Sequence, residues 1–193
     1  MRRIVVQNTV SLDGFFEGPD RDISWHQVDD ALHRHLNDEL SAMGAFLAGR
    51  VTWELMAAYW PTADADPAAA APEREFAGIW REKPKIVFSR TLTAAGWNTE
   101  IRREVDPDEI RALKAQPGCD LVLSGTSVAT ALRAHDLVDE WRLYDNPILL
   151  GRGNRMFADA DTRTGLRLVE TRTFGNGVVL MRYERTNARL SSE

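Results

Sequence analysis

An apolar run that passes through a glycine and an arginine straight into a helical pattern is the feature that most constrains this chain. Ala45 to Ala48 predict a buried strand, and Val51 to Tyr59 predict a short helix. Gly49 lies between them and lets the backbone pass close to a ligand, while the free N–H groups of a helix start attract an anion. The guanidinium of Arg50 can donate two charge-assisted hydrogen bonds to phosphate oxygens. The junction therefore predicts a phosphate site.

A second junction of the same kind follows downstream. The strand pattern Leu121 to Leu123 runs into Ser124-Gly125-Thr126-Ser127 and then into a helical pattern that ends at Ala134. Two junctions indicate a dinucleotide, which has two ends to hold. No Gly-x-Gly-x-x-Gly run occurs in the sequence, so the usual Rossmann fingerprint is missing and another dinucleotide fold is needed.

Apolar runs alternate with helical patterns along the rest of the chain. Such alternation is typical of an α/β sheet, which binds ligands beyond the carboxyl ends of its parallel strands. An exposed loop is predicted from Thr62 to Pro72, and a closing hairpin from Leu166 to Thr173 and Val178 to Arg185. Further strands are predicted at 4–9, 85–89, 96–101 and 141–150, and further helices at 28–43, 73–81 and 106–116.

Composition limits the classes of partner. The 193 residues carry a net charge of −5 with no block of Lys or Arg, which argues against a nucleic-acid or anionic-membrane surface and for a small-molecule partner. No apolar stretch approaches a membrane span or a signal peptide, so a cytoplasmic protein is expected. The single cysteine, Cys119, and the histidine spacing predict no metal site. One domain over 1–185 and a polar tail over 186–193 are expected.

Six segments together resemble the dihydrofolate reductase-like superfamily, most closely the C-terminal reductase domain of bifunctional riboflavin-biosynthesis enzymes. The resemblance implies an α/β fold with a mixed, mostly parallel sheet flanked by helices and a C-terminal antiparallel hairpin. It also implies NADPH as the cofactor. The segments that carry it are 11–14 (SLDG), 49–54 (GRVTWE), 87–92 (VFSRTL), 124–125 (SG), 137–140 (LVDE) and 147–153 (PILLGRG).

The resemblance implies where NADPH would lie. Gly49, Arg50 and Thr52 would hold phosphate at one helix start, and Ser124, Gly125, Thr126 and Ser127 would hold the pyrophosphate at the other. Ser89 and Arg90 match the family position near the adenosine 2′-phosphate, which would favour NADPH over NADH. At Ser124 the family usually has glycine, so a hydroxyl beside the pyrophosphate path is a departure from the pattern.

The substrate side leaves alternatives open. Asp13 and Gly14 follow the first strand, where this superfamily covers the nicotinamide, so the segment from Asp13 to Gly18 is predicted either as a lid or as a turn in which Asp13 caps backbone N–H groups. Trp25 precedes Asp29 and Asp30, and one of these carboxylates would face the pocket in a dihydrofolate reductase. The alternative for both is a role at the helix start. Asp145 interrupts an apolar strand and is a candidate for substrate binding.

An NADPH-dependent reductase of a small heterocyclic, carbonyl or imine substrate is the function that these residues favour. It would resemble the 5-amino-6-(5-phosphoribosylamino)uracil reductase of riboflavin biosynthesis, with Asp13, Asp29, Asp30 or a water as the proton source. No deaminase zinc motif precedes the reductase-like region. The alternatives are a true dihydrofolate reductase and a non-catalytic NADPH-binding protein. The resemblance also implies a homodimer.

Overall fold

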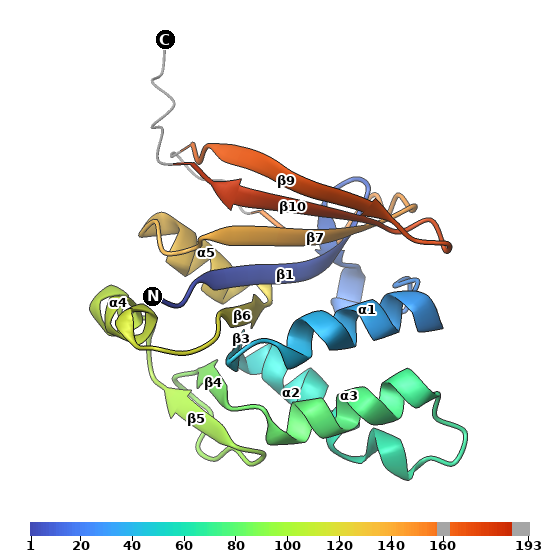
Figure 1. Ribbon diagram of the computed structural model, residues 1–193, viewed down its shortest axis with the longest axis horizontal. Helices are drawn as coiled ribbons and strands as arrows, with labels where there is room; N and C mark the ends of the chain where they lie inside the picture. The colour runs from blue at the N-terminus through green and yellow to red at the C-terminus, as the bar shows by residue number, and fades with distance from the viewer. Residues whose placement is uncertain (158–162, 187–193) are drawn as a thin grey trace.

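A single twisted sheet forms the centre of the molecule (Figure 1). The structure is a computed structural model that describes residues 1–157 and 163–186. Within these residues the strand order is β5-β4-β3-β6-β1-β7-β10-β9, parallel from β5 through β7 and antiparallel at β10 and β9. The strands are β1 (Ile4–Ser11), β3 (Ala45–Gly49), β4 (Lys85–Phe88), β5 (Thr99–Arg102), β6 (Leu121–Ser124), β7 (Glu140–Asn146), β9 (Leu166–Thr173) and β10 (Val179–Arg185).

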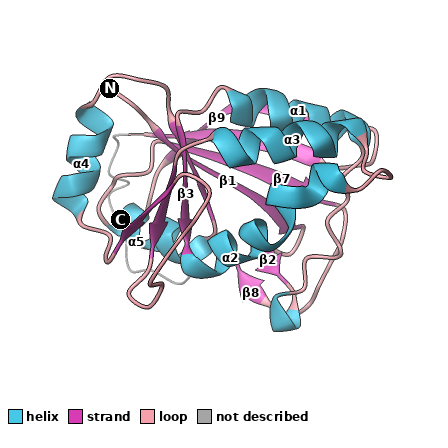
Figure 2. Ribbon diagram, turned by 90° about the horizontal axis from the view of Figure 1, so that it is seen from below, coloured by secondary structure: helices cyan, strands magenta, loops and turns pink. Residues whose placement is uncertain are grey.

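Helices cover both faces of the sheet, with α1 and α3 on one face and α4 and α5 on the other (Figure 2). The side chains of β1 show why. Ile4, Val6 and Val10 point into the core beneath α4 and α5, whereas Val5 points into the core beneath α1. The helices are α1 (Asp30–Ser41), α2 (Arg50–Tyr59), α3 (Ala71–Glu82), α4 (Pro107–Ala115) and α5 (Thr126–Ala134), with short 3-10 turns at Pro19–Arg21 and Trp60–Ala65.

The predicted fold class is confirmed, including the closing hairpin of β10 on β9. The predicted start of the fourth helix is also confirmed, because Asp106 accepts hydrogen bonds from the N–H groups of Asp108 and Glu109 and Pro107 occupies the first helical position. None of the helices in the described residues has the length and hydropathy that a membrane crossing needs.

Three predicted segments differ from the structure. The strand predicted at 96–101 begins only at Thr99, because Trp97 and Asn98 adopt a positive φ that does not fit a strand. The strand predicted at 141–150 ends at Asn146, because Pro147 follows it and has no N–H to offer the ladder. The exposed loop predicted from Thr62 to Pro72 is partly buried: Ala63 and Ala69 enter the core, and α3 already begins at Ala71. Of the predicted tail, residues 187–193 lie outside the described part of the chain.

A second, two-stranded sheet was not predicted from sequence. β2 (Phe15–Glu17) directly follows β1 and pairs antiparallel with β8 (Asn154–Arg155), which follows β7. Both segments leave the sheet at the carboxyl ends of their strands, so this small sheet lies at the same edge as the starts of α2 and α5 (Figure 2). It places the segment predicted as a lid against a loop far away in the sequence.

Candidate functional site

The starts of α2 and α5 face each other at the carboxyl edge of the sheet. A Cβ on Gly125 would lie 2.6 Å from Thr52 Oγ1, and a Cβ on Gly49 would lie 3.1 Å from Ser127 Oγ. Each glycine therefore makes room for a hydroxyl of the opposite helix. No side-chain cap accepts a hydrogen bond from the first turn of either helix, so two sets of backbone N–H groups are left for an anion.

A surface hollow of about 330 Å³ opens beside these helix starts. It brings together six of the predicted cofactor residues, whereas Ser124, Gly125 and Thr126 lie outside its lining. The side chain of Arg50 lies along its own helix, where its Nη1 is 2.7 Å from Glu54 Oε2. Arg90 is exposed. The hollow is lined by Gly49, Arg50, Val51, Thr52, Phe88, Ser89, Arg90, Thr91 and Ser127.

The turn after β4 is held from two sides. Ser89 Oγ accepts hydrogen bonds from the N–H groups of Thr91 (3.2 Å) and Leu92 (2.9 Å). From outside the turn, Arg103 Nη1 donates to the carbonyls of Ser89 (3.2 Å) and Leu92 (2.6 Å). Ser89 thus fixes the turn that presents Arg90. Sequence reasoning missed Arg103, because only the pairing of β4 with β5 brings it there.

The Ser124-Gly125 turn is fastened to β1. Ser124 Oγ donates to the carbonyl of Gln7 (3.2 Å), and the N–H of Gly125 donates to Asn8 Oδ1 (2.9 Å). Gly125 has a φ of +96°, a conformation that disfavours any side chain. The hydroxyl that departs from the family pattern is therefore bonded to β1. The N–H groups of Thr126 and Ser127, in the uncapped first turn of α5, are the donors left for a pyrophosphate.

Asp13 joins two loops. Its Oδ1 accepts from Ser11 Oγ (2.7 Å) and the N–H of Leu150 (3.1 Å), and its Oδ2 accepts from the N–H of Gly151 (2.7 Å). Hydrogen bonds from Ser11, Gly151 and Leu150 stabilise the carboxylate and lower the pKa of Asp13 to about 2. Asp13 therefore caps backbone N–H groups of the facing loop, a contact compatible with either alternative for residues 13–18, and an ionised carboxylate is a poor proton donor at neutral pH.

The segment predicted as a lid is bound to the loop after β7 at further points. The N–H of Met156 donates to the carbonyl of Gly14 (2.9 Å), and Asn154 Nδ2 donates to Glu17 Oε1 (2.6 Å). Gly153 has a φ of +142°, and a Cβ there would collide with the Glu17 carbonyl. The two loops consequently form one unit beside the strand ends.

The remaining substrate candidates are dispersed. Trp25 donates its indole N–H to the carbonyl of Asp22 (3.0 Å). Asp29 caps α1 by accepting from the N–H of Leu32 (2.8 Å), and Asp30 is exposed and pairs with Arg34 at 3.0 Å. These contacts explain both aspartates by the helix start and give no support to a role in a pocket.

Asp145, the last of the substrate candidates, lies near the end of a strand of the main sheet. It lies in β7 beside Val10 of β1 and Val179 of β10, one residue before the strand ends. It is half-buried, and burial raises its pKa. A carboxyl group of this kind keeps its proton to higher pH than an exposed aspartate.

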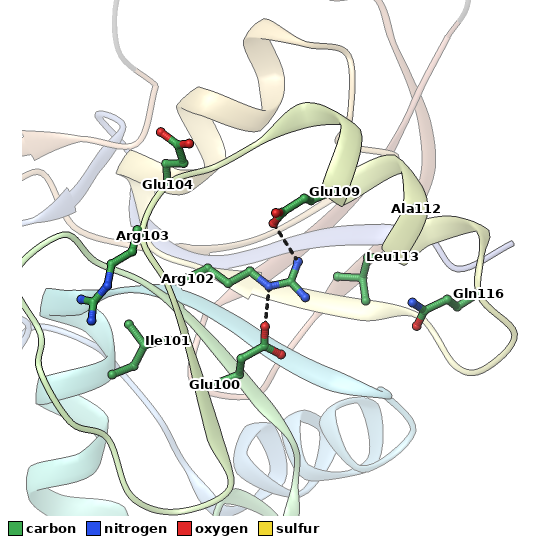
Figure 3. A pocket seen from close by; sticks show the side chains of 9 residues that line it. All are labelled: Glu100, Ile101, Arg102, Arg103, Glu104, Glu109, Ala112, Leu113 and Gln116. Atoms are coloured by element: carbon green, nitrogen blue, oxygen red, sulfur yellow. Dashed lines mark hydrogen bonds and ion pairs between the residues drawn. The ribbon is translucent and has the colours of Figure 1, made fainter.

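A larger hollow lies at the β5 edge, between β5 and α4 (Figure 3). At its centre Arg102 Nε lies 2.8 Å from Glu100 Oε1, and its Nη1 lies 3.8 Å from Glu109 Oε2. The guanidinium is thus neutralised by its own neighbours, and the lining of this hollow shares no residue with the hollow at the starts of α2 and α5. Across the described residues, the His, Cys, Asp and Glu side chains nowhere gather into a group of three that could hold a metal ion.

Comparisons with known proteins identify the family of this chain. The family model described as "RibD C-terminal domain" matches residues 2–180. The protein named "Uncharacterized protein YyaP" from Bacillus subtilis is 35% identical over 183 residues, which cover 94% of each chain.

Two solved structures show the same fold. The crystal structure of a putative riboflavin biosynthesis protein from Shewanella sp. PV-4 has a TM-score of 0.72 at 20% identity, covering 96% of this chain and 99% of the other. A dihydrofolate reductase from Enterococcus faecalis, complexed with NADP(H) and RAB-propyl, has a TM-score of 0.63 at 14% identity, covering 96% and 97%.

Proposed function

Because this chain belongs to the family of RibD C-terminal domains, we propose that it is an NADPH-dependent reductase of a small-molecule substrate. The facing starts of α2 and α5 are the observation that carries the proposal. Gly125 against Thr52 and Gly49 against Ser127 let the two helix starts approach closely, and neither start has a side-chain cap for its first N–H groups. Two uncapped helix starts side by side suit the two phosphates of a dinucleotide.

Arginine side chains lie where the adenosine end of NADPH is proposed to bind. Arg50 and Arg90 line the same hollow, and Arg103 holds the turn that presents Arg90. A 2′-phosphate in this hollow would draw Arg50 away from Glu54, and its charge would complement both guanidinium groups. The preference for NADPH over NADH follows from these arginines.

Bound NADPH would supply the hydride. The protein's own residues position the reactants and exclude water. The unit formed by residues 13–18 and 150–157 covers the strand ends, with Asp13 as its anchor. We propose Asp145 as the proton source, because it lies at the carboxyl end of β7 beside Val10 of β1 and burial raises its pKa. Asp145→Asn should lower kcat with little change in NADPH affinity, and in the wild-type enzyme kcat should fall as the pH rises through the pKa of this carboxyl.

The substrate is a small heterocycle, carbonyl or imine of the riboflavin-pathway type, such as 5-amino-6-(5-phosphoribosylamino)uracil. The family supports this class. A dihydrofolate reductase is disfavoured, because Asp29 caps α1 and Asp30 pairs with Arg34. If the wild-type protein reduced dihydrofolate and Asp30→Asn did not, the protein would be a dihydrofolate reductase after all.

We expect a homodimer in the cytoplasm. β9 is an edge strand whose outer side has no partner within the described residues. Its Leu166, Leu168 and Val169 are exposed, a pattern that invites pairing with a second chain. Sedimentation of the purified protein tests this expectation.

Calorimetric titration with NADPH and NADH tests the proposed function. NADPH should bind at least about tenfold more tightly than NADH, and Arg50→Ala and Arg90→Ala should each remove much of that difference. Arg111→Ala is the matched control, since Arg111 also forms an ion pair within its own helix but lies on α4. NADPH binding without turnover of any acceptor would indicate a non-catalytic binding protein.

A further inference from the structure

The buried side-chain amide of Asn8, in the middle of β1, connects two segments. One is the Ser124-Gly125 turn, called here the pyrophosphate turn, and the other is residues 13–18, the proposed lid. Asn8 is only 6% exposed, and both ends of its side chain are engaged. Its Oδ1 accepts from the N–H of Gly125 at 2.9 Å, on the turn that opens α5. Its Nδ2 donates to Met156 Sδ at 3.4 Å, on the loop after β7.

The connection continues from Met156 into the lid. Met156 is 2% exposed and belongs to the main core cluster. Its backbone N–H donates to the carbonyl of Gly14 at 2.9 Å, directly before β2. Three hydrogen bonds therefore join Gly125 to Gly14, although these residues lie on loops far apart in the sequence.

The chemistry of the position is specific to asparagine. The buried Gly125 N–H requires an acceptor, and the buried NH2 group of the amide finds a weak acceptor in the Met156 sulfur, so the two contacts fix the orientation of the amide. Aspartate would supply no donor, and leucine would supply neither group. Val6 and Val10, the neighbours of Asn8 on the same face of β1, are apolar core residues. Burying a polar side chain between them costs free energy unless its polar atoms are hydrogen-bonded, so losing either bond of Asn8 would destabilise the fold.

We propose that Asn8 is a positioning residue that couples occupancy of the pyrophosphate turn to closure of the lid. A dinucleotide held by Thr126 and Ser127 fixes the Gly125 turn. Gly125 then fixes Asn8, and Asn8 holds Met156 and Gly14 in the closed position. The inference rests on the proposed function for the identity of the ligand, but the coupling itself is a property of the free protein. Because such coupling is reciprocal, loosening the lid must also loosen the turn.

Hydrogen exchange of the full chain measures the coupling in both directions, from the lid to the Gly125 turn and from the turn to the lid. In the free protein, Met156→Leu removes the sulfur but keeps an apolar side chain of similar size. It should accelerate exchange several-fold at residues 13–18 and also at Gly125. Met43→Leu is the matched control, because Met43 is a buried methionine in the separate cluster beneath α1, and it should change neither segment. Faster exchange at 13–18 alone, or at neither segment, overturns the coupling.

Saturating NADPH gives the second readout. In the wild-type protein it should slow exchange at residues 13–18. In Asn8→Leu the nucleotide should bind about tenfold more weakly and that protection should be lost, with kcat lowered as well as KM raised. If NADPH fails to bind the wild-type protein, the proposed function fails, while the free-protein comparison still decides whether Asn8 couples the two segments. If Asn8→Leu does not fold, Met156→Leu carries the test. Full protection of 13–18 in a folded variant that lacks either bond contradicts the proposal.

Discussion

The two regions that meet at the carboxyl edge of the sheet are built in opposite ways. The proposed phosphate region is made of short local segments, in which a strand, a glycine and a helix start follow one another within a few residues at Gly49 and Gly125. The proposed lid region is made of contacts between distant segments, such as Asp13 with Leu150 and Gly151. The first region therefore depends on backbone geometry, and the second depends on individual side chains and loop packing.

Gly125→Ala should have the largest effect on the phosphate region. The added Cβ would lie 2.6 Å from Thr52 Oγ1, and the φ of +96° strains any side chain. We expect NADPH affinity to fall by about two orders of magnitude, since a strain of 1–3 kcal/mol adds to a displaced helix start. Calorimetry measures the loss.

Gly78→Ala is the control for that substitution. Gly78 lies within α3, where an added Cβ would meet nothing within 4 Å, so the protein should be stabilised by about 0.5–1 kcal/mol with affinity unchanged. Wild-type NADPH affinity in Gly125→Ala would show that the phosphate region does not need this backbone geometry.

Gly153→Ala should break the lid region with a smaller effect. The new Cβ would collide with the Glu17 carbonyl and separate the two loops. We expect kcat to fall about tenfold, with a smaller change in NADPH affinity, because the proposed lid would cover the reacting groups. Steady-state kinetics separate the two parameters. Gly151→Ala also has a positive φ but meets nothing within 4 Å, so an equal loss of kcat in both variants would assign the effect to strain alone.

Asp13→Asn should have a smaller effect, and one that depends on pH. The pKa of Asp13 is lowered from 3.8 to about 2 in the folded state, so the ionised form stabilises the fold above pH 4. This contribution is lost as the pH falls from about 4 through 2. Thermal unfolding should show a lower Tm for Asp13→Asn at pH 7 and a difference that shrinks toward pH 3. A constant difference across that range would show that charge plays no part in the anchor.

The contrast also explains what could be predicted from the sequence. The strand-to-helix junctions, the Asp106 cap and the final hairpin are local patterns, and the structure contains all three. The small sheet of β2 and β8 has too few residues to show any periodicity. The roles of Asn8 and Arg103 depend on partners that only the strand order brings near. Asp13 was found from its motif, but its partners on the distant loop were not.

A crystal structure of the protein with bound NADPH is the direct test of the proposed cofactor site. We expect the pyrophosphate between the starts of α2 and α5, bonded to the N–H groups of Thr126 and Ser127, with the 2′-phosphate between Arg50 and Arg90 and Arg50 released from Glu54. Nucleotide bound elsewhere, for example in the hollow around Arg102, with the two helix starts empty, would contradict it.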